Sequence, residues 1–321
     1  MATTADDLID RRRLRRKLTF WRVAAILVAA VAVVGLAMAF AGDRFAGKSL
    51  DHIAKVKIEG TILQDDDLLE RLDEIAKSSR VKGVILEINS PGGTTAGGES
   101  IFEAVRAVAE KKPVVAQVGT LAASAGYMIA SAADHIVARQ SSIVGSIGVL
   151  VQFPDVTGLM DKLGVKLEEV KSSPLKAEPT PFNPTTEEER AMLRAMVMDS
   201  YDWFVGLVEQ RRPLDRAEVL RLADGSVFTG RQALANKLVD GLGGEKEAIA
   251  WLAEKGVSGS LTVIEWKPSD SGGLLFSEAI ATSVGAAVGL PAAGADIVKR
   301  SGLDRLFLDG LISVWQPSSA L

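Results

Sequence analysis

The chain has 321 residues, of which 47% are hydrophobic and 24% are charged, a balance typical of a packed globular protein. Its formal net charge of −4 gives no general electrostatic argument for nucleic-acid binding. It contains no cysteine, which excludes disulfides, thiolate metal sites and a cysteine nucleophile together.

The N-terminus predicts a membrane anchor. A basic run at residues 11–17 precedes an uncharged apolar run at residues 23–42, which is long enough to cross a bilayer core of about 30 Å. Basic residues before this run and few after it predict that residues 1–22 stay in the cytoplasm and that the rest lies outside. A cleaved signal peptide is the alternative, because residues 37–39 have a small-x-small form, but signal cores are shorter, roughly 7–15 residues.

Behind a linker at residues 43–53, strand and helix patterns alternate, which predicts an α/β domain over residues 54–266. Residues 267–321 are rich in small and apolar side chains and are expected to form a packing or assembly segment. Strands are expected at residues 56–60, 83–88, 113–118 and 135–138, an extended segment at 145–153, and helices at 66–79, 99–111, 185–212 and from about 215.

The segment GTLAASAGYMIASAAD, residues 119–134, places Ser124 among small apolar residues directly before a predicted helix. A helix that starts there presents the Ala125 amide beside the hydroxyl, and its dipole favours an anion. A strand-to-helix turn with an exposed serine is a recurrent nucleophile geometry, although a serine at a helix start can also act only as a cap. The glycines of NSPGG, residues 89–93, allow an amide to approach a ligand closely, or form an ordinary turn.

A serine nucleophile needs a proton acceptor, and the chain has only two histidines. His52 lies in the linker, where solvation is expected, and His135 lies in a predicted strand, so a Ser-His-Asp triad has little support. Lysine is the other option, because burial disfavours the ammonium form and Ser–Lys pairs are an established variant of the triad. The candidate is Lys176, in the proline-rich loop at residues 170–184, unless it is a solvated surface charge.

Four segments in this order resemble the S49 peptidase family of membrane-anchored serine proteases, the signal peptide peptidase A type. The family's fold is related to the Clp protease and crotonase superfamily, and the resemblance covers most of residues 53–255. A further segment at residues 224–244 resembles the family's closing segment, and the chain length is similar to that of the short form with one protease domain. The four segments are NSPGG, the segment around Ser124, SSIVGSIGV at residues 141–149, and KSSPLKAEPTPFNP around Lys176.

The resemblance implies that Ser124 is the nucleophile and Lys176 the general base. It implies an oxyanion hole formed by the amides of Gly93 and Ala125, and chemistry that needs no metal or cofactor. The chain departs from many members in having Ala125-Gly126 where they have Gly-Gly, and Lys176-Ala177 where they have Lys-Asp. The second departure leaves open which residue orients the amine, with the serines at 172 and 173 as candidates.

The resemblance also implies a single-pass protein of the bacterial inner (cytoplasmic) membrane with its catalytic domain on the periplasmic side. Such a protein degrades cleaved signal peptides, and other envelope peptides or proteins, through an acyl-enzyme. Family members assemble into rings or domes, so a homo-oligomer, an octamer, is expected, and some members build the dyad across neighbouring subunits. The sequence leaves open whether this chain does so.

Two other functions are alternatives to a protease. A crotonase-like acyl-CoA enzyme would share the fold and the oxyanion hole, but it needs a carboxylate in its pocket and basic residues for the phosphates of CoA, and residues 119–134 are mostly apolar. A non-catalytic membrane scaffold would keep the fold and act by binding, and the presence of both Ser124 and Lys176 argues against it.

Overall fold

The computed structural model describes residues 20–25, 27–28, 48–268 and 312–314. The chain divides into two compact units, Met1–His52 and Ile53–Leu321. The predicted membrane anchor at residues 23–42 lies largely outside the described residues. Among the residues that are described, no helix combines the length and the apolarity that a membrane crossing requires.

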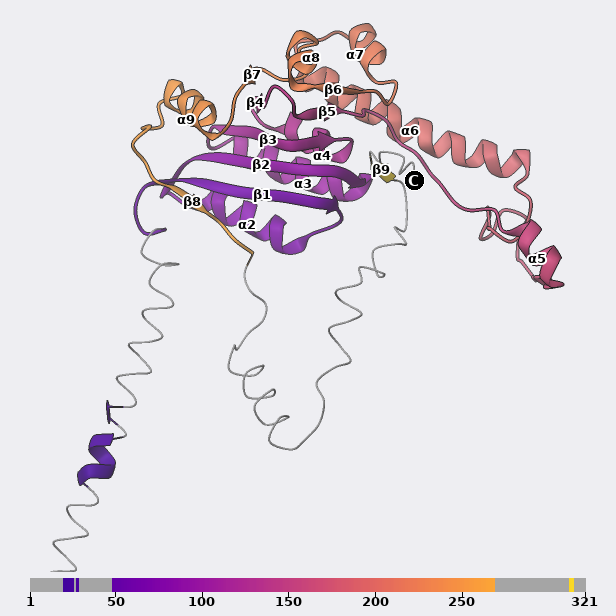
Figure 1. Ribbon diagram of the computed structural model, residues 1–321, viewed down its shortest axis with the longest axis horizontal. Helices are drawn as coiled ribbons and strands as arrows, with labels where there is room; N and C mark the ends of the chain where they lie inside the picture. Colours follow the sequence, from indigo (N-terminus) through magenta and orange to yellow (C-terminus); the bar gives the residue numbers. More distant parts are fainter. Residues whose placement is uncertain (1–19, 26, 29–47, 269–311, 315–321) are drawn as a thin grey trace, which may run out of the picture. The chain divides into compact units, whose positions relative to one another are not determined.

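A mixed β-sheet forms the frame of the second unit (Figure 1). Within the described residues its path runs β6-β5-β3-β2-β1-β8, with β4 paired to β3 and β7, and β9 paired to β2. The pairs β5–β6 and β2–β9 are antiparallel, whereas β1–β8, β2–β3, β3–β4, β3–β5 and β4–β7 are parallel. The strands are β1 (His52–Ile62), β2 (Val81–Thr94), β3 (Val114–Ala123), β4 (His135–Ala138), β5 (Ile143–Gly145), β6 (Val227–Thr229), β7 (Gly241–Leu242), β8 (Val263–Glu265) and β9 (Ile312–Val314).

Helices cover both faces of this sheet, α2, α3 and α4 on one side and α9 on the other (Figure 1). Leu86 of β2 packs into the larger apolar cluster with the first three helices, whereas its neighbour Ile85 packs with Leu252 of α9. Strands buried on both faces carry near-continuous apolar runs, which is why β2 and β3 stand out in the sequence. The helices are α2 (Asp66–Lys77), α3 (Thr95–Ala109), α4 (Ala125–Ala132), α5 (Thr157–Leu163), α6 (Glu187–Arg211), α7 (Arg216–Leu222), α8 (Gly230–Ala235) and α9 (Glu245–Glu254).

Most of the predicted helices are confirmed. Their starts were predictable because the capping side chains are close to the helix start in the sequence. At α6, the Thr186 side chain accepts a hydrogen bond from the Glu189 amide, and the Glu189 carboxylate accepts one from the Thr186 amide. α3 begins four residues earlier than predicted, because the Thr94 hydroxyl accepts a hydrogen bond from the Gly97 amide at 3.2 Å.

The extended segment predicted at residues 145–153 contains regular strand only at its first residue, because β5 lies at Ile143–Gly145. Gly145 and Ser146 have φ values of +109° and +51°, and this change of backbone conformation ends the strand. The chain then leaves the sheet and forms the short helix α5, which the sequence pattern did not predict. No residue of α5 is buried, so its apolar side chains face away from the core.

Candidate active site

Ser124 occupies the turn between β3 and α4, and its backbone has φ +57° and ψ −122°. A positive φ at a residue with a side chain costs on the order of 1–3 kcal/mol and is often found where function requires it. The turn is held by two backbone hydrogen bonds, from Ser124 N to Gly145 O at 2.8 Å and from Met128 N to Ser124 O at 2.9 Å. The Ser124 side chain makes no capping hydrogen bond to α4, so the alternative role as a helix cap is wrong.

The register of β2 against β3 directs the NSPGG segment toward this turn. Ile88 pairs with Val118, but the next pair is Ser90 with Ala122, so the register shifts between them. Ser90 therefore lies beside a residue two positions before Ser124. Extending this register by two or three positions directs the two glycines of NSPGG toward Ser124 and the start of α4.

The two predicted oxyanion donors, Gly93 and Ala125, lie in different local environments. A Cβ on Gly93 would lie 1.8 Å from the Ile62 carbonyl oxygen, so only glycine fits where β2 passes the end of β1. Ala125 is the first residue of α4, and its N–H has no acceptor within the helix. Its side chain packs tightly, since a Cβ on Gly98 would lie 3.1 Å from the Cβ of Ala125.

The short strand β9 pairs with the same segment of β2. Its partners are Gly92 with Val314, Gly93 with Ser313 and Thr94 with Ile312, in antiparallel register. β9 belongs to the predicted C-terminal packing segment 267–321, of which the structure describes residues 267–268 and 312–314. The backbone of the candidate oxyanion segment thus lies against a strand from the far end of the chain.

His135 lies far from Ser124 along the sheet. His135 pairs with Val115 near the start of β3, nine positions before Ser124, which corresponds to roughly 30 Å along a strand. Its ring stacks on Trp251 with centroids 5.0 Å apart, and burial lowers its pKa, although the Asp240 carboxylate partly opposes this shift. His52 was expected to be solvated and is instead fully buried, with Nδ1 2.8 Å from Leu50 O.

Lys176 is exposed on the long segment between β5 and α6, whereas Ser124 is buried. Among the hydrogen bonds and ion pairs of the described residues, none is between these two side chains. The backbone N–H of Lys176 donates to Ser173 O at 3.2 Å. No side-chain hydrogen bond from Ser172 or Ser173 to the amine occurs among these residues, and the proposed orienting role of these serines gains no support.

The N-terminal half of α6 carries the lysine segment away from the core (Figure 1). The buried apolar residues of α6 begin only at Phe204, seventeen positions after Glu187, which is about 25 Å along a helix. We call residues 157–200, comprising α5, the lysine loop and the first half of α6, the arm. Its exposed apolar side chains include Leu159, Leu163, Val165, Phe182, Met196 and Met198.

Comparison with known proteins places this geometry in a family. The model for peptidase family S49 matches residues 106–258, which include Ser124 and Lys176, and the Clp protease model matches residues 53–144. An Enterococcus faecium protein named "Putative signal peptide peptidase SppA" is 33% identical over 240 residues, and the match covers 70% of each chain. The chain belongs to peptidase family S49. By class it is a serine protease with the α/β fold of the Clp protease type.

Two other relatives show how much of the family pattern the chain shares. A Methanocaldococcus jannaschii protein named "Putative protease MJ0651" is 38% identical over 203 residues, 63% of this chain and 65% of that protein. "Serine protease SPPA, chloroplastic" of Arabidopsis thaliana is 30% identical over 237 residues, 70% of this chain and 34% of that protein. The chain therefore spans about two thirds of the first relative's length and about one third of the second's.

In this S49 protease, the loop that carries Lys176 is braced by ion pairs that sequence reasoning missed. The Lys171 ammonium binds the Glu178 carboxylate and lies 2.8 Å from Glu169, and the hydrogen bonds that it donates to Glu169 and Glu178 raise the pKa of Lys171. Asn183 donates to Glu169 at 2.8 Å and closes the loop on its other side. The alternation of acids and lysines at residues 168–178 is the only sequence signal for this brace.

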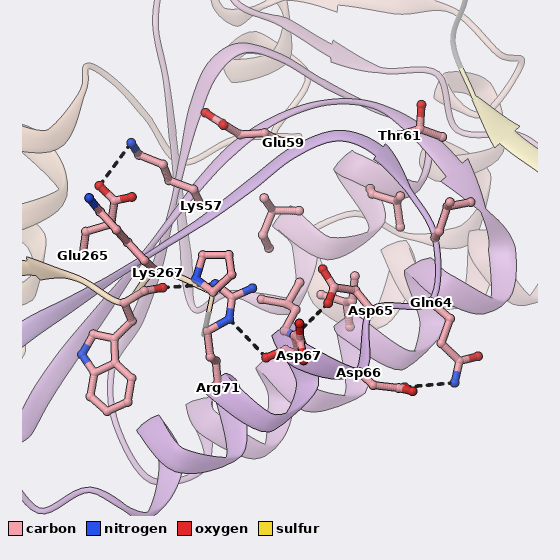
Figure 2. Close-up of a pocket in the computed structure, with 17 residues that line it drawn as sticks. Lys57, Glu59, Thr61, Gln64, Asp65, Asp66, Asp67, Arg71, Glu265 and Lys267 are labelled. Carbon is pink, nitrogen blue, oxygen red and sulfur yellow. Dashed lines mark hydrogen bonds and ion pairs between the residues drawn. The ribbon is translucent and has the colours of Figure 1, made fainter. Parts of the chain in front are cut away.

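A pocket of about 680 Å³ lies elsewhere, between β1, the start of α2 and the chain after β8 (Figure 2). Two of the charged side chains that line it are held by partners: Lys57 pairs with Glu265 at 3.2 Å, and Arg71 donates to Trp266 O at 3.1 Å. None of the four candidate catalytic residues lines it. Within the described ranges, no group of three or more ligating side chains is arranged to hold a metal ion.

Proposed function

We propose that this S49 protease is an endopeptidase with Ser124 as its nucleophile and Lys176 as its general base. The observation that carries the proposal is the backbone at Ser124, because a serine with positive φ in a tight turn between a strand and a helix has the conformation of a recurrent nucleophile turn. The position of His135, roughly 30 Å along β3, leaves lysine as the candidate base.

In the proposed reaction, the neutral amine of Lys176 takes the hydroxyl proton while the Ser124 oxygen bonds to the carbonyl carbon of a peptide. The carbonyl oxygen becomes an oxyanion, which the N–H groups of Gly93 and Ala125 stabilise. When the C–N bond breaks, the lysine ammonium returns the proton to the leaving amine. Water then hydrolyses the acyl ester with the same amine as base, which restores both side chains.

We infer that the lysine comes from a second copy of the chain. The first half of α6, which belongs to the arm, buries no apolar residue within its own unit. Most helical stability in proteins, however, comes from packing of an apolar face. A neighbouring copy that covers the exposed apolar side chains of the arm would supply this packing. It would also enclose Lys176 beside its own Ser124, and enclosure favours the neutral amine that the reaction needs.

The proposed substrates are apolar peptides, including signal peptides left after cleavage. The side chains around Ser124 are small and apolar, and the Enterococcus faecium relative is named "Putative signal peptide peptidase SppA". The uncharged run at residues 23–42 behind a basic flank supports a single-pass anchor in the bacterial inner (cytoplasmic) membrane, with the catalytic domain on the periplasmic side. A ring of eight copies is the assembly we propose.

A mixing experiment tests both the dyad and its sharing between copies. Ser124→Ala and Lys176→Ala should each abolish hydrolysis of a fluorogenic apolar peptide while assembly, measured by light scattering, persists. If the two variants are dissociated, mixed equally and reassembled, random neighbours should restore about one quarter of the wild-type sites. Hydrolysis by Ser124→Ala alone would overturn the nucleophile, and two inactive variants that never complement would place the dyad within one chain.

A further inference from the structure

Ser90 is a fully buried serine where β1, the NSPGG segment and α4 meet. Its hydroxyl donates a hydrogen bond to Gly60 O at 2.7 Å and accepts one from Gly92 N at 3.1 Å. Gly60 and Gly92 have φ values of +71° and +110°, conformations that only glycine adopts without strain. One hydroxyl therefore restrains two glycines, which have no side chains of their own to hold them.

Ser90 also lies directly against the start of α4. A Cβ on Gly126 would lie 2.9 Å from Ser90 O and 3.3 Å from Ser90 Cβ, which leaves no room between the two segments. In the sheet, Ser90 pairs with Ala122, two residues before Ser124. Ser90 is thus in contact with both of the segments that supply the candidate oxyanion donors.

We propose that Ser90 is a positioning residue for the oxyanion hole. By fixing the Gly92 amide, its hydroxyl limits the conformations of the two consecutive glycines, so that the Gly93 N–H stays aimed at the same point as the Ala125 N–H. Donors in such a hole are effective only when they are aligned before the charge develops. The inference rests on the proposed function, because it takes Gly93 and Ala125 as the donors and Ser124 as the nucleophile.

Ser142 provides a matched control for the loss of a buried hydroxyl. It is 2% exposed, donates to Gly119 O at 2.6 Å and accepts from Arg139 N at 3.0 Å. The two serines therefore share burial and bonding pattern, but the hydrogen bonds of Ser142 do not involve the NSPGG segment. Ser142→Ala reports what the deletion costs the fold, and any additional effect of Ser90→Ala reports on the oxyanion hole.

The experiment compares full-length wild type with Ser90→Ala, Ser142→Ala and Ser124→Ala. It measures kcat and KM for an apolar peptide, and the affinities for a peptide aldehyde and for the matching product acid. The aldehyde forms a tetrahedral adduct whose oxygen needs the hole, whereas the product acid needs only the groove. Ser90→Ala should lower kcat roughly tenfold to a hundredfold with little change in KM. Ser90→Ala should also weaken binding of the aldehyde more than binding of the product acid. Ser142→Ala should leave the ratio of these two affinities unchanged.

Equal affinity ratios for Ser90→Ala and Ser142→Ala would overturn the role of Ser90. Where Ser90→Ala does not fold, Ser90→Cys decides, because the thiol keeps the volume but is a weak hydrogen-bond donor. It should show the same selective loss in kcat and aldehyde affinity, and wild-type values would overturn the inference. Ser124→Ala separates the two proposals. Full activity of Ser124→Ala would contradict the proposed function. An inactive Ser124→Ala together with a fully active Ser90→Ala would contradict only the role of Ser90.

Discussion

At the scale of single residues, the candidate site contains residues whose backbone conformations are unfavourable for any residue with a side chain. Ser124 has φ +57° in the turn before α4, and the hydrogen bonds of its N–H and C=O hold it there. Such strain persists only because the surrounding structure determines the conformation. Ala177, next to Lys176, also has a positive φ of +64°. Both members of the proposed dyad thus lie at, or beside, an unusual backbone conformation.

Replacing Ser124 by glycine should reveal this strain. Glycine adopts a positive φ at no steric cost, so Ser124→Gly should be more stable to unfolding than Ser124→Ala by about 1 kcal/mol, although both are inactive. Ser124→Ala is the control, since it also lacks the hydroxyl but keeps the Cβ. Denaturant unfolding of both variants measures the difference, and equal stabilities would mean that the turn is not strained.

At the scale of elements, a buried arginine joins the end of α6 to the segment before β7. The Arg212 guanidinium, directly after α6, binds both oxygens of Asp240 at 2.9 and 2.7 Å and donates to Lys237 O at 2.9 Å. Asp240 also accepts a hydrogen bond at 2.8 Å from the amide of Ile136 in β4. This cluster fixes the packed half of α6 and so sets the direction in which the arm leaves the core.

Asp240→Ala should lower the free energy of unfolding by about 3 kcal/mol, because it leaves a buried guanidinium without its counter-charge. The matched control is Asp202→Ala. Asp202 pairs with Arg216 at 3.3 Å on the surface, and loss of such a pair should cost less than about 1 kcal/mol. Chemical denaturation checks both values, and a loss for Asp240→Ala no larger than that of the control would contradict the assignment.

The brace of the lysine loop should matter for turnover more than for folding. Glu178→Gln removes the charge that holds Lys171, which should let the loop around Lys176 move and lower kcat roughly tenfold. Glu168→Gln, an exposed neighbour on the same loop, is the control and should keep the wild-type rate. Steady-state kinetics at low salt measures the effect, and a wild-type kcat for Glu178→Gln would show that the brace does not position the lysine.

At the scale of the whole molecule, the features that the sequence could predict are those set by residues close together in the chain. Features set by contacts between distant segments could not be predicted. The start of α6 was predictable because its capping box involves neighbours in the chain, and the strands of the sheet because both faces are buried. Ser124 could be singled out by its small neighbours, but its φ depends on contacts with β5. α5 was missed because its apolar residues contact nothing in the core, and the partner of Lys176 depends on assembly.

If a second copy supplies Lys176, the specific activity must depend on protein concentration. Dilution should separate the copies, expose the arm and lower the activity per chain, whereas the unfolding of the core should change little. Sedimentation and peptide hydrolysis measured across the same dilution series check this. A specific activity that stays constant after the copies have separated would contradict the shared site.

The pairing of β9 with Gly92–Thr94 makes the end of the chain a competitor for the backbone groups that a peptide strand would use. A peptide can occupy that position only during the fraction of time in which β9 has left it. Its apparent affinity is then reduced by that fraction, whatever the strength of its own contacts. Because this factor is the same for every peptide, it leaves the ranking of peptides unchanged and raises the concentration at which any of them fills the site.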